Sequence, residues 1–456
     1  MMQFFHGLQK QVMVQDQSEE RFGISRGLSG FIGSSLWAIT GQVTSAVGMV
    51  LGVRIITEYV SPSVFGTASL CIGIVALGSG VFNGPVCQAL LRMYPDMQRK
   101  SRLPLLIKEI RRLLIKSNGL LIAASIAVGL IFWLFFEVDF VVLLLLGGLF
   151  VLEALRGVVV TVLSAQNKIK THALVVAGDV WARQTFAVLL IVIFGASVTS
   201  IMGGYLVGGA LLLSMWYVRV LRGINNRGDD HDDLEQGNHV RHEIIEFSRP
   251  LMPIALAGWV SGLGDRYVIG GILGLEAAGI YAAIYALVSK PFIMISAALE
   301  LVLRQSYYHA VSVDDEREQT KVMSVWVLST FVASMVCLVL VTCWSDELTG
   351  LFFGEKFKSG ASLMPWIAAG YCLFALSAPL ERRAYAYKKT SSVLRIQAGG
   401  ALASVLAGTG GTYFYGLLGA AWAVPVYFGC QLALAVYLTR TLSRSSLCVE
   451  RKPDHE

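Results

Sequence analysis

Charged side chains that stand inside long apolar runs are the residues of this sequence best suited to chemistry. Three of them are basic, Arg156, Arg183 and Lys290. An ionised group in a hydrocarbon interior is costly, so such residues are typical of a substrate pathway or of an ion pair inside the protein. Guanidinium and ammonium groups are common phosphate ligands. The chemistry they predict is therefore the binding of an anionic group.

Acidic residues at similar depth offer a structural alternative to ligand binding. Three acid–base pairs have the spacing of one helix face: Glu153 and Arg156, Asp179 and Arg183, and Glu300 and Arg304. Glu300 and Arg304 lie near the end of their apolar run, which favours a structural ion pair over a ligand site. The other two pairs could neutralise themselves, or they could contact a pyrophosphate group and lock one face of the protein. Their spacing leaves both interpretations open.

Lys290 differs from the other embedded bases because no acid stands three or four residues from it. Pro291 follows it, which bends a helix and frees a backbone carbonyl. An unpaired ammonium near the middle of a membrane helix must face water, an acid of another helix or an anionic ligand. We therefore expect Lys290 to line a cavity and to bind an anion.

Arg54 and Arg266 lie near the outer ends of two apolar runs. They could receive the same anion at a later stage, or extend to the membrane surface as arginines commonly do. Asp265 is a candidate coupling carboxylate, since its protonation would distinguish two conformations. The alternative, which we slightly favour, is that Asp265 caps the outer helix end beside Arg266. Glu153 and Asp179 are further candidates for coupling or gating.

The elements that must position these residues are membrane helices. The chain has 456 residues, of which 55% are hydrophobic and 15% charged, with a mean hydropathy of +0.62. Its apolar runs are long enough to cross a bilayer as helices and lack the alternation of barrel strands. The fold class is therefore an all-α integral membrane protein. Basic residues give a net charge of +6 but fall between the runs, which excludes nucleic-acid binding.

The apolar runs predict twelve transmembrane helices in two six-helix bundles. The expected spans are residues 29–53, 65–91, 113–136, 140–164, 171–195, 198–219, 248–272, 277–303, 322–344, 361–387, 391–414 and 417–439. The expected organisation is a cytoplasmic tail 1–26, a first bundle 27–221, a cytoplasmic linker 222–247, a second bundle 248–440 and a cytoplasmic tail 441–456. We expect the linker to be solvated, and its acids and histidines to bind no metal.

Lys and Arg gather in the two tails and in alternate loops, so both termini are predicted to be cytoplasmic. The stretch 93–116 has leucines and isoleucines on one helical face beside basic residues, and we expect it to lie on the inner membrane surface. The seven cysteines include no CxxC pair, so they are expected to be packing residues.

The two halves share a repeated pattern. RIITEYVSPSVFGTASL at 54–70 and RYVIGGILGLEAAGIYAAIYAL at 266–287 each have an Arg, a short turn and a Gly, Gly66 or Gly279, that opens the next helix. VLSAQNKIKTHALV at 162–175 is similarly matched by RAYAYKKTSSVLRI at 383–396. Since each half has six spans, the repeats would be parallel, an arrangement from which alternating access is built.

These stretches, with the full DRYVIGGILGLEAAGIYAAIYALVSKP segment at 265–291, resemble the Wzx-type lipid-linked oligosaccharide flippases. That family belongs to the multidrug, oligosaccharidyl-lipid and polysaccharide exporter superfamily. The resemblance implies two bundles around a central cavity that opens alternately to each side. It also implies translocation of an isoprenoid-pyrophosphate-linked oligosaccharide across the bacterial inner membrane for lipopolysaccharide or exopolysaccharide synthesis, with membrane lipids, a polymerase and export machinery as partners.

Other functions predict other sequences. A cation-coupled multidrug exporter of the same superfamily would favour an acid-dominated cavity, whereas Arg156, Arg183 and Lys290 favour an anionic substrate. A membrane glycan polymerase would need a substantial outer loop, but the longest is about 345–360. A scaffold leaves the embedded charges unexplained. With no GxxxxGK[ST] motif, the energy would come from an ion gradient, the membrane potential or product removal. We expect a non-enzymatic transporter without catalytic residues, cofactor or metal.

Overall fold

The computed structural model describes residues 24–136, 140–225, 234–387 and 389–449, and regular structure within these ranges is helical throughout. The elements are α2 (Ile24–Tyr59), α3 (Pro62–Gly78), the π-helical η1 (Ser79–Asn83), α4 (Gly84–Arg99), α5 (Leu103–Phe136), α6 (Phe140–Ala165), α7 (Ile169–Phe194), α8 (Val198–Asn225), α9 (Leu234–Ser248), α10 (Leu251–Leu273), α11 (Leu275–Ser312), α12 (Glu316–Cys343), α13 (Ser345–Phe352), the 3-10 helix η2 (Glu355–Leu363), α14 (Met364–Ala386) and α15 (Thr390–Val449). The predicted all-α class is confirmed.

These elements make twelve membrane crossings, as predicted. α3, η1 and α4 form one crossing, and α15 contains two helices that meet at Gly416, where φ is 63°. Within the described ranges, nine segments are long and apolar enough to span a membrane, and Thr390–Arg440 is one of them although it holds two crossings. α10 is not among the nine, since Asp265 and Arg266 lower its hydropathy. α5 is the other crossing that is not among the nine.

Local sequence explains the short turns between crossings. Ser61 caps α3, where its Oγ accepts a hydrogen bond from the backbone N–H of Val64 at 3.4 Å, and Pro62 occupies the first helical turn. Gly274 separates α10 from α11 with a φ of 93°, a backbone conformation that favours glycine. A single residue therefore turns the chain back into the membrane.

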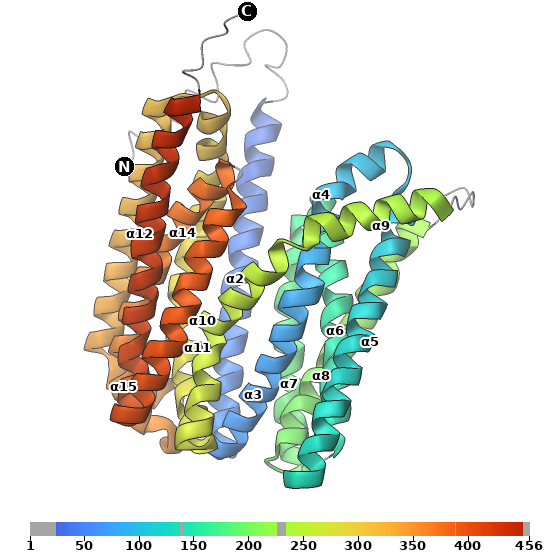
Figure 1. Ribbon diagram of the computed structural model, residues 1–456. Helices are drawn as coiled ribbons and strands as arrows, with labels where there is room; N and C mark the ends of the chain where they lie inside the picture. Colours follow the sequence, from blue (N-terminus) through green and yellow to red (C-terminus); the bar gives the residue numbers. More distant parts are fainter. Residues whose placement is uncertain (1–23, 137–139, 226–233, 388, 450–456) are drawn as a thin grey trace, which may run out of the picture.

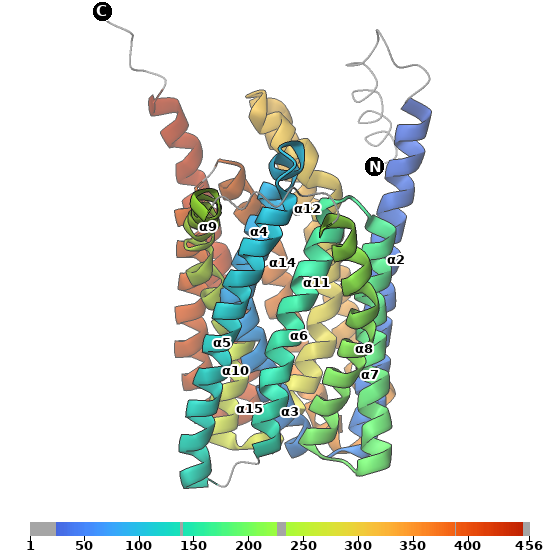
Figure 2. The same ribbon diagram turned by 90° about the vertical axis from the view of Figure 1, so that its right-hand side faces the viewer.

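The helices form two groups. α2 to α8 pack mainly with one another, as do α10 to α15, and the main contact between the groups is that of α3 with α11. Figures 1 and 2 show α9 at one face of the molecule, here called the α9 face, and the turn between α10 and α11 at the opposite face, here called the turn face. In Figure 1 the two groups lie close together at the turn face and diverge toward the α9 face.

Two glycines allow the groups to meet at the turn face. A Cβ on Gly279 of α11 would lie 1.8 Å from the carbonyl oxygen of Pro62, and one on Gly66 of α3 would lie 2.2 Å from that of Leu275. No side chain fits at either position. These are the glycines that the sequence placed at equivalent points of the two halves, so the repeat brings them together in one helix crossing.

Glycines at other places in the membrane helices differ in how closely they pack. Gly204 and Gly208 of α8 do pack closely on α7, where a Cβ would lie 2.3 and 2.5 Å from backbone atoms. Gly262 has no atom within 4 Å of an added Cβ, and Gly258 meets only a side-chain oxygen at 3.8 Å. These two residues of α10 therefore make no close contact with another helix among the described residues.

The second half of the predicted linker is not a solvated coil. α9 packs Val240 and Ile244 into a buried cluster with α4 and α5, and Arg241 Nε lies 2.7 Å from Oε2 of the buried Glu109. The prediction for 222–247 is wrong there because its apolar residues recur with helical spacing. Residues 226–233, which hold the linker's acidic run, lie outside the described ranges. The domain boundaries on either side stay a prediction.

The amphipathic stretch 93–116 does not form a helix that lies on the membrane surface. Its residues continue the spanning helices α4 and α5, which are joined by a turn around Ser101 with a φ of 58°. Leu106 and Ile110 are buried against α9 instead of in lipid. The same apolar face thus serves a helix-to-helix contact, which periodicity alone does not distinguish from membrane binding.

We expect Gly279→Ala to destabilise the purified protein in detergent by about 1–3 kcal/mol, because an added methyl group forces α11 away from the Pro62 carbonyl. The measurement is the thermal unfolding midpoint. Gly271→Ala is the matched control on α10, since nothing lies within 4 Å of its added Cβ, and it should change stability by less than about 1 kcal/mol. Equal midpoints for the two variants would contradict the close crossing.

Candidate functional site

The embedded charges of the first half form one network between α6 and α7. Arg183 Nη1 lies 2.6 Å from Glu153 Oε1, and Arg183 Nε lies 3.0 Å from Asp179 Oδ1. Arg156 Nη2 lies 2.9 Å from Glu153 Oε2, and its Nε lies 3.8 Å from Asp179 Oδ2. The predicted same-face pairs are confirmed as contacts. The structure adds that each carboxylate also faces the arginine of the other helix.

This network neutralises itself. It contains two positive and two negative groups, and its carboxylates are mostly buried, with side-chain exposures of 15% for Glu153 and 8% for Asp179. Only Arg183 Nη2 is buried without a hydrogen-bond partner, and Arg156 is 35% exposed. Burial strengthens each attraction, so the arrangement binds α6 to α7 and leaves little net charge for a ligand.

The second half holds two cations with no such compensation. No side-chain nitrogen of Arg266 or Lys290 has a carboxylate oxygen within 4.0 Å among the residues that the structure describes. Lys290 is only partly buried, and Arg266 lies within electrostatic reach of it. Like charges repel, so an anion between or beside them would be favoured. Lys290 thus lacks a carboxylate partner in the structure, as its sequence neighbours predicted.

Arg266 is oriented by neutral groups. Its Nη1 donates to Ser69 Oγ at 3.2 Å, and its guanidinium carbon lies 5.1 Å from the centre of the Tyr285 ring. Its Nε is buried and has no hydrogen-bond partner among the described residues. Guanidinium over an aromatic ring is held without losing charge. The side chain therefore keeps a donor and its full positive charge for another group.

Asp265 lies inside α10 and does not cap its end. Tyr281 OH donates to Asp265 Oδ2 at 2.6 Å, the backbone N–H of Arg266 donates to Oδ1 at 2.8 Å, and the residue is 4% exposed. α10 continues to Leu273, so the favoured interpretation as an end cap is wrong. Asp265 and Arg266 are sequence neighbours, and both lie against tyrosines of α11, Asp265 against Tyr281 and Arg266 against Tyr285.

Arg54 is engaged away from these cations. It pairs with Glu58 one turn later on α2, and its Nε donates to the carbonyl oxygen of Leu351 at 3.0 Å. This contact fastens α2 to α13 of the second group near the turn face. The structure does not join Arg54 to Arg266 or Lys290 through any contact that it describes.

Sequence reasoning missed Glu381 of α14. Its carboxylate accepts hydrogen bonds from Gln397 Nε2 at 3.0 Å to each oxygen and from Gln431 Nε2 at 2.9 Å. Gln431 is fully buried. Because Arg382 and Arg383 follow it, the sequence alone indicates that Glu381 belongs to a polar helix end. The signal that could have found it is the pair of glutamines inside otherwise apolar runs.

Glu300 also has more than its predicted partner. Arg304 Nη1 and Arg382 Nε each lie 3.0 Å from Glu300 Oε1. The favoured structural pair with Arg304 is confirmed, and a second helix joins it.

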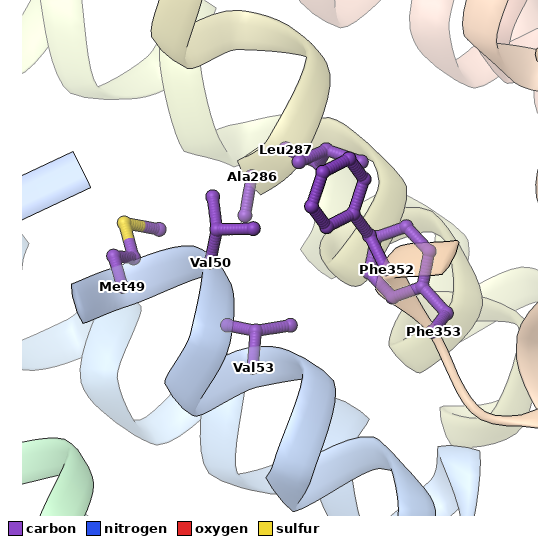
Figure 3. Close-up of a pocket in the computed structure, with 7 residues that line it drawn as sticks. All are labelled: Met49, Val50, Val53, Ala286, Leu287, Phe352 and Phe353. Carbon is purple, nitrogen blue, oxygen red and sulfur yellow. The ribbon is translucent and has the colours of Figure 1, made fainter. Parts of the chain in front are cut away.

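Figure 3 shows a different kind of feature, an apolar hollow between the two groups of helices. Its lining residues are Met49, Val50 and Val53 of α2, Ala286 and Leu287 of α11, and Phe352 and Phe353.

Comparison with known proteins gives one family and one fold. The sequence pattern of a family described as "polysaccharide biosynthesis protein" matches residues 55–362. No curated protein matches the chain. Among solved structures, the chain is similar to an inward-facing multidrug resistance MATE family transporter of the MOP superfamily, with a TM-score of 0.71, 12% identity and coverage of 92% of this chain and 100% of that one.

The chain is also similar to the lipid II flippase MurJ in an inward closed conformation, with a TM-score of 0.66, 14% identity and coverage of 90% of this chain and 87% of that one. An outward-facing MATE family transporter gives a TM-score of 0.60 at 13% identity, covering 91% of this chain and 97% of that one. Identities this low show the fold alone.

The resemblance to the exporter superfamily is thus confirmed at the level of fold, and the chain is a multi-pass membrane protein. The family match adds what the solved structures do not give, since it rests on sequence. It extends from the second half of α2 into η2, and so includes both glycines of the crossing and both uncompensated cations. With most of its length matched, this chain belongs to the polysaccharide biosynthesis protein family.

Proposed function

We propose that this protein moves an isoprenoid-pyrophosphate-linked oligosaccharide from the inner to the outer leaflet of the bacterial inner membrane by alternating access. The α9 face would be cytoplasmic, as the distribution of basic residues predicts. The observation that carries the proposal is the uncompensated cation pair of Arg266 and Lys290 inside the membrane region. Membership of the polysaccharide biosynthesis family supports the class of substrate.

A pyrophosphate group suits this pair chemically. It carries negative charge and several acceptor oxygens, and charge-assisted hydrogen bonds are about twice as strong as neutral ones. Arg266 offers its unpartnered Nε, and Lys290 offers an ammonium that is still partly exposed. A cationic drug would instead be repelled here, which makes the multidrug exporter the weaker alternative.

The other predicted binding residues take supporting roles. Arg156 and Arg183 would hold the first group together through Glu153 and Asp179, and partly exposed Arg156 would be the one that meets a passing anion. Arg54 would act at the turn face, where its contact with Leu351 must break before that face opens. Asp265 is our candidate coupling carboxylate, since its protonation would remove a buried charge beside Arg266.

The apolar hollow marks a route for the isoprenoid chain of the substrate. It lies between α2 of the first group and α11 of the second, and its lining is free of charged side chains (Figure 3). The hollow is about the size of one water molecule, so the two groups would have to move apart for an isoprenoid chain to pass along this apolar lining while the head group occupies the polar interior. The product would then pass to the polymerase and export machinery of surface polysaccharide synthesis.

The first test is Lys290→Ala in a strain that lacks the chromosomal gene. We expect loss of at least about tenfold in surface polysaccharide at normal protein level, because one uncompensated cation is removed, and partial activity for Lys290→Arg. Lys358→Ala, which removes an exposed lysine paired with Glu355, is the control and should support normal synthesis. Full activity of Lys290→Ala would exclude the proposed role of Lys290.

The second test separates the network from the binding site. Glu153→Gln leaves two arginines with one carboxylate, and removing one partner of a buried ion pair costs about 3–5 kcal/mol. Its unfolding midpoint should therefore fall clearly. Glu58→Gln breaks an exposed pair with Arg54 and should cost less than about 1 kcal/mol. If Glu153→Gln kept full stability but lost transport, the network would be a ligand site after all.

The third test fills the hollow. Val50→Trp should reduce surface polysaccharide and cause the lipid-linked intermediate to accumulate, because the indole would occupy the path of the isoprenoid chain. Val47→Trp, one turn earlier on α2 at a position that is 46% exposed, is the matched control and should behave like the unmodified protein. The readout is the amount of lipid-linked precursor in membrane extracts. Equal behaviour of the two variants would count against this route.

A further inference from the structure

Three side chains of α10 reach across to α3 and join the two groups of helices. Trp259 Nε1 donates to the carbonyl oxygen of Gly73 at 2.9 Å, and Tyr267 OH donates to that of Leu70 at 2.7 Å. Between them, Arg266 Nη1 donates to Ser69 Oγ at 3.2 Å. We call these three bonds the α3–α10 contact line.

The contact line lies next to the glycine crossing but deeper in the molecule. From Gly66 to Gly73 the helix rises by about 10 Å, so the line extends from the crossing toward the α9 face. The fit is close, since a Cβ on Gly73 would lie 2.5 Å from the hydroxyl oxygen of Tyr267. Separation of the two groups at the turn face therefore requires that these bonds break.

Arg266 differs from the other two donors. Trp259 and Tyr267 bond to backbone carbonyls, which cannot be displaced from their helix, whereas the partner of Arg266 is a single neutral hydroxyl. The guanidinium has no carboxylate partner, its Nε is unsatisfied, and Lys290 lies within electrostatic reach. A diphosphate that approached Lys290 would offer Arg266 charge-assisted bonds that a serine hydroxyl cannot match.

We propose that Ser69 is a positioning residue that holds Arg266 on α3 while the site is empty, and that a diphosphate group draws Arg266 away from Ser69 and so loosens α3 from α10. The inference rests on the proposed function and deepens it. Binding of the head group would itself weaken the closure at the turn face. Arg266 would then both recognise the charge of the head group and control the opening of the turn face.

The test uses a cysteine pair that reports the distance between α3 and α10. Gly270 and Leu70 suit it, because a Cβ on Gly270 would lie 3.3 Å from Leu70 Cδ1, and the backbone acceptor of Tyr267 is kept. Leu70→Cys and Gly270→Cys are combined in a protein whose native cysteines are replaced by alanine. The fraction joined by a short bifunctional reagent is measured with and without inorganic pyrophosphate, and with sulfate at the same ionic strength.

In the background with Ser69 intact, pyrophosphate should lower the ratio of cross-linked to free protein about fivefold, the effect of one net hydrogen bond on the equilibrium, and sulfate should not. Ser69→Ala should lower it without pyrophosphate and abolish most of the further response. Thr67→Ala, which removes a hydroxyl bonded within α3 to the Ser63 carbonyl, is the matched control and should behave as the parent. Lys290→Ala should remove the response to pyrophosphate while keeping the closed fraction high.

Tyr267→Phe is the control for an unspecific loss of structure. It removes a bond of the contact line that does not involve Arg266, so it should lower the cross-linked fraction yet keep the response to pyrophosphate. The proposal fails if Ser69→Ala leaves the fraction unchanged, or if pyrophosphate has no effect on the parent. The proposed function fails separately, if the lipid-linked intermediate does not accumulate and surface polysaccharide is unchanged when the gene is deleted.

Discussion

The free-energy cost of placing charge inside a membrane protein determines how the embedded side chains of this structure are arranged. An ionised side chain in a low-dielectric interior must find an opposite charge, water or a ligand. In the first half of the chain the embedded charges are balanced, because two arginines and two carboxylates on α6 and α7 pair with one another. In the second half they are not, because no side-chain nitrogen of Arg266 or Lys290 forms an ion pair among the described residues, and the nearby carboxylate of Asp265 bonds to Tyr281 and to a backbone N–H instead.

This asymmetry gives the two groups of helices different tasks. In the first group the neutral network joins α6 to α7, so its charges hold two helices together. The second group carries the unbalanced charges: the two cations and two buried carboxylates, Asp265 and Glu381, which are bonded to neutral donors. Charges held by neutral donors can gain or lose a partner at smaller cost than those in a closed ion-pair network. The second group is therefore the part that we expect to respond to substrate and to ions.

Movement between the groups depends on how they touch. At the turn face they meet backbone to backbone through Gly66 and Gly279, where neither side chain nor lipid intervenes. α9 packs on the first group through Glu109 and its apolar face, so the described part of the connection between the halves is a docked helix. A contact this close has few intermediate arrangements, and separation of the halves would be a change between two discrete states.

The sequence by itself determined the class of the protein, the twelve crossings, the repeat and the isolation of Lys290. These follow from hydropathy and from spacing along one helix, which are local properties. Only the tertiary structure decided which charges cancel, because Arg183 meets Glu153 across two helices. It also decided that Asp265 is buried, that Glu381 lies between two glutamines, and that α9 docks on α5. Each of these depends on the rotation of one helix against another, which no single stretch of sequence specifies.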